Sequence, residues 1–183
     1  NQFYGGTHAG TWTYGLPEMP GQREKIKTAT QIANPGCYAT AISVGLMPLI
    51  PFITNQGLKE ITVVAASGTT GAGRSLKSNL LASEVMSSLS AYKVGGVHQH
   101  TPEIEENIQR ITKKEITLSF IPILAPMPRG ILATISASVS ADLSLSELQN
   151  SFEIAYGNEL FVDVLNQGES LQTSSLTGSN GLQ

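Results

Sequence analysis

The stretch NPGCYATAISVGLMPLI, residues 34–50, places the single cysteine of the chain at the start of an expected helix. Pro35 and Gly36 suit the turn before a first helical residue, and the nearly continuous apolar run after Cys37 indicates a buried helix over 37–49. Unpaired N–H groups at that helix end favour a thiolate and can hold a developing oxyanion. The sequence therefore predicts a nucleophilic Cys37, with a small buried hydrophobic cysteine as the alternative.

The composition describes a chain of ordinary domain size with many apolar residues. Of its 183 residues 40% are hydrophobic and only 14% are charged, so we expect part of the surface to lie against another protein. The net charge of -3 gives no electrostatic reason to bind nucleic acid or an anionic membrane. One cysteine forms no internal disulfide, which indicates a reducing, cytoplasmic compartment. No apolar run approaches ~18 residues, so no membrane span is expected, and the opening residues 1–6 indicate part of a longer protein.

A glycine-rich loop, SGTTGAGRS at 67–75, follows a β-branched run at 59–66 that predicts a buried strand. Such a loop lets backbone N–H groups approach an anion, and Arg74 can add a forked contact. The Gly-Lys-Ser/Thr ending of a nucleotide-phosphate loop is missing. The alternative interpretation is a flexible connection with a solvated arginine.

Two histidines, His98 and His100, form a second group of candidate functional residues. Thr101 and Pro102 read as the N-cap and the first residue of a helix that runs to about residue 111. Alternate positions place the two histidine side chains on one side if the backbone there is extended. Three interpretations stay open: general acid/base groups for the thiol, metal ligands beside the cysteine, and plain polar residues. Because no second cysteine or histidine cluster completes a zinc site, we predict no metal.

The remaining elements predict one α+β domain with a mainly antiparallel sheet. Alternating runs at 115–122 and 131–140 read as half-buried strands that could pair antiparallel, joined by a proline-rich connection that contains Arg129. Ser144-Leu-Ser-Glu147 is a capping box that opens a helix to about Tyr156. We further expect an irregular approach over 1–33 with His8 as an ordinary surface histidine, helix or loop over 76–90, and a short strand over 161–165.

Five motifs occur in one order: YGLPE at 14–18, NPGCY at 34–38, SGTTGAGR at 67–74, HQHTPEI at 98–104 and PMPRGI at 126–131. Together they resemble the N-acetyl-gamma-glutamyl-phosphate reductase family over nearly the whole chain. The resemblance implies a glyceraldehyde-3-phosphate dehydrogenase-like carboxyl-terminal domain, with helices packed on one face of its sheet. Residues 1–183 match only this catalytic and oligomerisation domain. We therefore expect the amino-terminal dinucleotide-binding domain and the carboxyl-terminal end to lie outside this chain.

The resemblance also implies a reaction, the NADPH-dependent reduction of an acyl phosphate in arginine biosynthesis, through a thioester on the cysteine. Glu103 is expected to serve the helix start and not the chemistry. The residues that the resemblance assigns are Cys37 as nucleophile, His98 as general acid/base, His100 in support, Arg74 and Arg129 at substrate anions, and Gly71 and Gly73 at the NADP cofactor.

Three other functions stay open beside this one. Related semialdehyde dehydrogenases act on aspartyl or N-acetyl-aminoadipyl phosphate, and one methylene group separates the last substrate from the glutamyl one. A cysteine hydrolase needs no dinucleotide, and a non-catalytic assembly module needs no reactive thiol. The family resemblance and the low charge both predict a homodimer or homotetramer.

Overall fold

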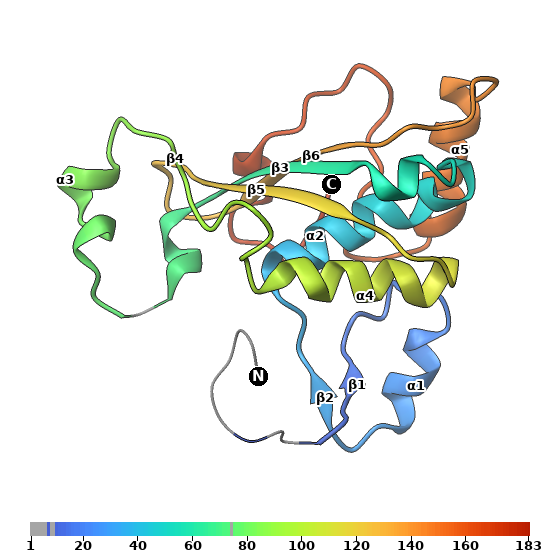
Figure 1. The fold of residues 1–183 in the computed structure, drawn as a ribbon, viewed down its shortest axis with the longest axis horizontal. Coiled ribbons are helices and arrows are strands. Elements are labelled where there is room, and N and C mark those ends of the chain that lie inside the picture. Colours follow the sequence, from blue (N-terminus) through green and yellow to red (C-terminus); the bar gives the residue numbers. More distant parts are fainter. Residues whose placement is uncertain (1–6, 8–9, 74) are drawn as a thin grey trace.

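The computed structural model describes Thr7, residues 10–73 and residues 75–183, and shows a mixed sheet with helices beneath it (Figure 1). No helix in these ranges is both long and apolar enough to cross a bilayer. The helices and strands, in chain order, are β1 Thr13–Tyr14, α1 Gln22–Thr28, β2 Ile32–Ala33, α2 Cys37–Leu46, β3 Ile61–Ser67, α3 Ala82–Val85, β4 Ser90–Ala91, α4 His100–Thr112, β5 Leu118–Leu124, β6 Ile131–Ser136 and α5 Leu145–Tyr156.

The main sheet has four strands in the order β4-β5-β3-β6. The predicted α+β fold is confirmed, but the sheet is mixed: β3 runs parallel to β5 and antiparallel to β6, and β4 is antiparallel to β5. The expected direct pairing of 115–122 with 131–140 is wrong, because β3 lies between those two segments. Its apolar sequence, ITVVAAS, suits a central strand with neighbours on both edges.

Helices α2 and α4 pack on one face of this sheet, as predicted (Figure 1). The core between them contains Ile42, Val63, Ile104 and Phe120, which are fully or almost fully buried. Helix α2 is apolar on nearly all sides, so it occupies the interior and carries its first residue to the edge of the core. It ends at Leu46, earlier than expected, and the chain continues as a 3-10 helix over Met47–Phe52.

Within the residues that the structure describes, the positions of β3, β5 and β6 on the opposite face of the sheet carry no charged side chain. Val64 of β3 and Leu132 of β6 are 38% and 42% exposed, which is unusual for large apolar side chains in neighbouring strands. The strand register puts short hydroxyl and apolar side chains around them, namely Thr62, Ala66, Ser119, Ile121, Ile123, Thr134 and Ser136.

The first described part of the chain is a small βαβ unit, where an irregular approach was expected. β1 and β2 pair in parallel and α1 connects them, so the unit forms a separate layer beside the start of α2 (Figure 1). Helix α1 follows Gly21, which lies in the left-handed region without a side-chain cap. The sequence of α1, QREKIKT, lacks an apolar stripe, and these two features explain why the helix was missed.

Three other boundaries differ from the expectations. Helix α4 begins at His100, before Pro102, because Gln99 already has helical angles and Thr101 is buried without acting as a cap. The segment 161–165 is not a strand and makes only an isolated bridge, Val162 with Leu182. Residues 76–90 form short helical turns with little burial. The capping box of Ser144 and Glu147 is confirmed, as is the helix to Tyr156.

The hydroxyl of Tyr156 ties α5 to α2. It donates a 2.7 Å hydrogen bond to the Val44 carbonyl, whose helical partner four residues on is Pro48, a residue without an N–H group. A Tyr156→Phe change removes this donor and leaves a buried carbonyl unpaired. We expect it to lower the free energy of unfolding by about 1–3 kcal/mol, measured by urea denaturation. An unchanged midpoint would contradict this role.

Candidate active site

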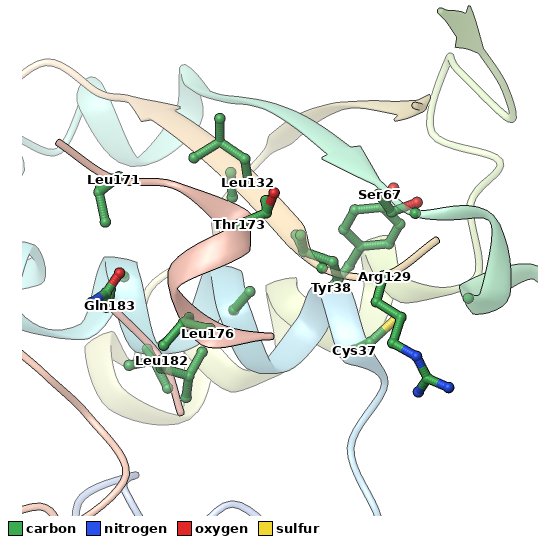
Figure 2. A pocket seen from close by; sticks show the side chains of 18 of the residues that line it. Cys37, Tyr38, Ser67, Arg129, Leu132, Leu171, Thr173, Leu176, Leu182 and Gln183 are labelled. Atoms are coloured by element: carbon green, nitrogen blue, oxygen red, sulfur yellow. The ribbon is translucent and has the colours of Figure 1, made fainter. Parts of the chain in front are cut away.

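Cys37 is the first residue of α2 and its side chain is exposed. It lies in a cleft of about 1500 Å³, shown in Figure 2, that extends from the thiol along β6 to the carboxyl-terminal segment. The largely buried helix that begins at Cys37 is as the sequence predicts. The alternative of a small buried hydrophobic cysteine is wrong, because Tyr38 and Ala39 enter the core in its place.

The turn before Cys37 is held from two sides. Gly36 is the N-cap, with an extended backbone, and its carbonyl accepts hydrogen bonds from the backbone N–H and the side chain of Thr40 at 2.8 and 3.1 Å. Its N–H donates to Oε1 of Glu103 at 3.0 Å. The same carboxylate oxygen accepts from the Tyr14 hydroxyl at 2.7 Å. Glu103 therefore reaches across to the cysteine turn and does more than favour the start of its own helix.

The two histidines meet beside this turn, with ring centroids 4.9 Å apart. His98 is 2% exposed and its Nδ1 accepts the backbone N–H of His100 at 3.1 Å, so the neutral ring carries its proton on Nε2. The rings of Tyr38 and Phe120 enclose it, with centroids 5.5 and 5.1 Å away. Burial, with smaller contributions from His100 and Lys93, lowers the pKa of His98 to about 4.

The ring of His100 lies against Gly36. A Cβ atom on Gly36 would stand 2.4 Å from Nε2 of His100, so only glycine leaves room for the imidazole there. Nδ1 of His100 is buried and has no hydrogen-bond partner among the described residues. Burial lowers the pKa of His100, while the nearby Glu103 carboxylate opposes that shift. The residue preceding the cysteine is thus in direct contact with one of the two histidines.

The glycine-rich loop is attached to the connection that contains Arg129. The N–H groups of Gly68, Thr69 and Thr70 donate to the carbonyls of Gly130, Met127 and Pro128 at 3.0, 2.9 and 3.1 Å. The amides of Gly71 and Gly73 donate to carbonyls within the loop, each at 3.3 Å. These five amides are therefore engaged within the protein.

The cleft brings together most of the predicted site residues. Arg74 and His8 lie outside the described residues, and Gly73 is exposed but does not line the cleft. The described lining includes two cations that the sequence did not single out, Lys77 and Lys93. The predicted residues that do line the cleft are Cys37, Gly71, His98, His100 and Arg129.

The charges along the cleft are unevenly distributed. Among the lining residues that the structure describes, the cations are Lys77, Lys93 and Arg129, and the carboxylate is Asp163. Asp163 accepts a hydrogen bond from Gln183 in the carboxyl-terminal segment. This arrangement favours an anionic ligand near the thiol. Within the described residues, no three histidine, cysteine or carboxylate side chains lie close enough to hold a metal ion.

A family model described as "Semialdehyde dehydrogenase, dimerisation domain" matches residues 37–183. The chain belongs to this semialdehyde dehydrogenase family. Proteins named N-acetyl-gamma-glutamyl-phosphate reductase are 55% identical over 181 residues in Acidothermus cellulolyticus and 47% identical over 182 residues in Streptomyces avermitilis. These alignments cover 99% and 100% of this chain but 52% and 53% of the relatives, so the chain spans about half their length.

Solved structures of the same semialdehyde dehydrogenase class share the fold. Aspartate semialdehyde dehydrogenase II of Vibrio cholerae matches with a TM-score of 0.66 at 14% identity, over 90% of this chain and 54% of that one. The Francisella tularensis aspartate enzyme gives 0.66 at 13%, over 92% and 59%. These likenesses confirm the predicted fold class, and the reductase relatives confirm the resemblance read from the motifs.

Two tyrosines of this candidate site were missed in the sequence. Tyr92 donates a 3.0 Å hydrogen bond to the hydroxyl of Tyr38, and Tyr38 donates to the Ala65 carbonyl at 3.4 Å. Burial is the main cause that raises the pKa of Tyr38, so its hydroxyl stays protonated at neutral pH. Tyr38 directly follows the cysteine, and this position in the sequence could have identified it as a residue of the site. No feature of the sequence could have identified Tyr92, because its hydrogen-bond partner is 54 residues away.

We expect the buried His98 and the partly buried His100 to make the fold sensitive to acid. In the unfolded chain the pKa of His98 returns to about 6.5. Below that pH, His98 therefore binds a proton in the unfolded state but stays neutral in the folded state. The free energy of unfolding is then expected to fall as pH drops from about 6.5 to 4, by up to about 1.4 kcal/mol per pH unit for this group. His100 acts in the same direction.

Urea denaturation at several pH values measures this slope. The free energy of unfolding of a His98→Gln variant is expected to fall less steeply with decreasing pH than that of the unmodified chain. Equal slopes in the two proteins would contradict the role of His98.

Proposed function

We propose that this chain is the catalytic and oligomerisation part of an NADPH-dependent N-acetyl-gamma-glutamyl-phosphate reductase. Such an enzyme forms N-acetyl-glutamate semialdehyde and releases phosphate, a step of arginine biosynthesis. The observation that carries the proposal is an exposed thiol at a helix start, beside two packed histidines in a cationic cleft. The relatives named as this reductase, at 43–55% identity, support the choice of substrate.

Cys37 is the proposed nucleophile. Its thiolate attacks the carbonyl carbon of the acyl phosphate, the bond from that carbon to the phosphate oxygen breaks, and phosphate leaves with the electron pair. The acyl group is then held as a thioester. The free N–H groups of the first turn of α2 point toward the thiol end of the helix and can stabilise the negative charge on the carbonyl oxygen. After reduction, the carbon–sulfur bond breaks, and the aldehyde and the thiolate are released.

NADPH supplies the hydride that reduces the thioester when it is bound. The loop at Gly71 and Gly73 fits the approach of such a group, because nothing stands within 4 Å of a Cβ position on either glycine. These glycines are proposed as contacts at the cofactor, beside a dinucleotide-binding domain that lies outside residues 1–183. The parallel unit of β1, α1 and β2, which lies before the matched residues 37–183, is proposed to join that domain's sheet.

The histidines are proposed to manage the proton at the carbonyl oxygen. His98 is the first candidate for general acid/base, since its neutral ring has Nε2–H as a donor while Nδ1 is engaged. His100 supports it from its position against Gly36. Because both histidines have lowered pKa values, they are proposed to be neutral at neutral pH, so the positive charge of the cleft comes from its lysine and arginine side chains.

The cations suit a substrate with two anionic ends. N-acetyl-gamma-glutamyl phosphate carries a phosphate and a carboxylate, and a guanidinium can bind either group bidentately. Arg129 is the described arginine of the cleft, and Arg74 is proposed as its companion. Lys77 and Lys93 also line the cleft and add positive charge to it.

The uncharged face of the sheet is proposed as the contact between copies of a cytoplasmic homodimer or homotetramer. Nine neighbouring positions on β3, β5 and β6 carry only apolar or hydroxyl side chains there. Faces of this composition are typical of obligate interfaces. The family description, a dimerisation domain, agrees with this use of the face.

The test is the reverse reaction of the enzyme that joins this chain to its dinucleotide-binding domain. N-acetyl-glutamate semialdehyde, phosphate and NADP+ are the substrates, and formation of NADPH is followed. Aspartate semialdehyde and N-acetyl-aminoadipate semialdehyde serve as competitors. We expect phosphate-dependent turnover with the highest kcat/KM for the glutamate compound, by about 10- to 200-fold over the homologue with one more methylene.

Other outcomes would replace the proposal. A preference for either competitor assigns the chain to that related dehydrogenase. Release of an acyl group from Cys37 by water, without phosphate or NADP+, indicates a cysteine hydrolase. Normal turnover after both Cys37 and His98 are replaced leaves this chain as an assembly module.

A further inference from the structure

Glu103 is placed where one carboxylate oxygen holds two segments that are distant in sequence. Oε1 accepts the Gly36 N–H at 3.0 Å and the Tyr14 hydroxyl at 2.7 Å. Gly36 precedes the nucleophile, and Tyr14 lies in β1, outside the range that matches the dimerisation domain. The carboxylate therefore joins the βαβ unit, the cysteine turn and helix α4.

Hydrogen-bond direction fixes this arrangement. Asn107, which is 2% exposed, uses its Nδ2 group to donate to the Tyr14 hydroxyl at 2.9 Å and to Ser43 Oγ at 3.0 Å. A tyrosine hydroxyl that accepts from an amide still has one proton, and here that proton goes to Glu103. Burial is the largest cause that raises the pKa of Tyr14, so this donor stays protonated at neutral pH. The network thus connects α2, α4 and β1 through groups whose roles as donor or acceptor are determined.

The same helix that carries Glu103 carries His100, one turn earlier. The His100 ring fills the space beside Gly36 that a Cβ would occupy. A single short helical segment therefore contacts Gly36 twice, through the carboxylate of Glu103 at its N–H and through the imidazole of His100 at its Cα. Movement of Gly36 changes the position of the thiol relative to the histidine.

We propose that Glu103 is a positioning residue, held by Tyr14, that fixes the Gly36 amide and thereby sets the thiol of Cys37 against His100. The catalytic consequence rests on the proposed function, whereas the geometric consequence does not. Glu103 itself touches neither substrate nor cofactor in this role. The charge of Glu103 also reaches His100, whose other charged or titratable neighbours include His98, Tyr38 and Lys93.

Two variants separate hydrogen bonding from charge. Glu103→Ala removes the acceptor, and we expect hydrogen exchange at the Gly36 amide to accelerate by about 10- to 100-fold in this chain. In the enzyme with its dinucleotide-binding domain, the same change is expected to lower kcat by about 100-fold, with KM changed less than about threefold. Glu103→Gln keeps an acceptor oxygen in place, so kcat is expected to stay within about tenfold of the unmodified enzyme.

Matched controls come from the same helix and from the same network. Glu106→Ala removes a neighbouring carboxylate of α4, which forms a surface ion pair with Arg110 at 2.6 Å, and is expected to change neither measurement. Tyr14→Phe removes the donor that holds Glu103 and is expected to shift both measurements in the same direction as Glu103→Ala, but less.

Each remaining outcome decides the matter. Unchanged Gly36 exchange in Glu103→Ala overturns the proposal, whatever the activity. A glutamine variant as slow as the alanine variant overturns it too, because charge and not position would then be required. If the unmodified enzyme reduces no acyl phosphate, the proposed function fails, while accelerated Gly36 exchange in Glu103→Ala still supports the geometric role.

Discussion

Replacement of Cys37 by serine is expected to lower acyl-phosphate reduction by at least about a thousandfold, with the fold unchanged. The side chain is exposed at the helix start, so an oxygen in place of sulfur fills the same space without disturbing the core. A serine hydroxyl is far less ionised at neutral pH, and the neighbouring histidines are enclosed and neutral there. The reaction then lacks a competent nucleophile.

Steady-state rates of the enzyme with and without the change measure this effect. This chain has no other cysteine, so alkylation gives a control: iodoacetamide should modify one thiol in the chain and should inactivate the enzyme that contains it. Prior incubation with the acyl phosphate should protect it. Retention of phosphate-dependent reduction in the serine variant would remove Cys37 from the mechanism.

Replacement of Gly68 by alanine is expected to be the most disruptive single-methyl change near the site. A Cβ there would lie 2.6 Å from the Arg129 nitrogen and 2.7 Å from the carbonyl carbon of Pro128, both backbone atoms. Since backbone cannot turn away as a side chain can, the two loops must separate and break the hydrogen bonds that join them. We expect a loss of about 2–3 kcal/mol in the free energy of unfolding, and a higher KM for phosphate as Arg129 moves.

The matched control is Gly71→Ala in the same loop. Nothing lies within 4 Å of the added methyl group, and the backbone there is not in the left-handed region, so stability is expected to change by less than about 0.5 kcal/mol. Urea denaturation compares the two variants. If the two variants lower the free energy of unfolding equally, loop flexibility explains the effect and the contact with Arg129 does not. A change in the KM for NADPH confined to Gly71→Ala would support that glycine as a cofactor contact.

The elements with strong local signals were predicted from sequence. The apolar run after Cys37, the capping box at Ser144 and the β-branched strand at 61–67 each have an energetic reason that a short window contains. Cys37 and the histidine pair were identified because residue type and local context carry chemical information. The structure places the two histidine rings 4.9 Å apart, and both rings line the same cleft as Cys37.

The strand order and the supporting residues were beyond local reasoning. Nothing near 115–140 indicates that β3 takes the place between β5 and β6, because sheet order depends on packing against α2 and α4. Glu103 reads as an ordinary first-turn acid, and its partners Tyr14 and Gly36 are 89 and 67 residues away. Such long-range hydrogen bonds leave no periodic or compositional trace.

The central position of β3 also has a consequence for synthesis of the chain. Both of its neighbours, β5 and β6, come later in the sequence. The ribosome therefore delivers the apolar strand that leads to the glycine-rich loop roughly fifty residues, or several seconds, before its first partner exists. During that time the edges of β3 and its valines are open to other nascent chains, which makes this segment the part of the molecule most in need of a chaperone.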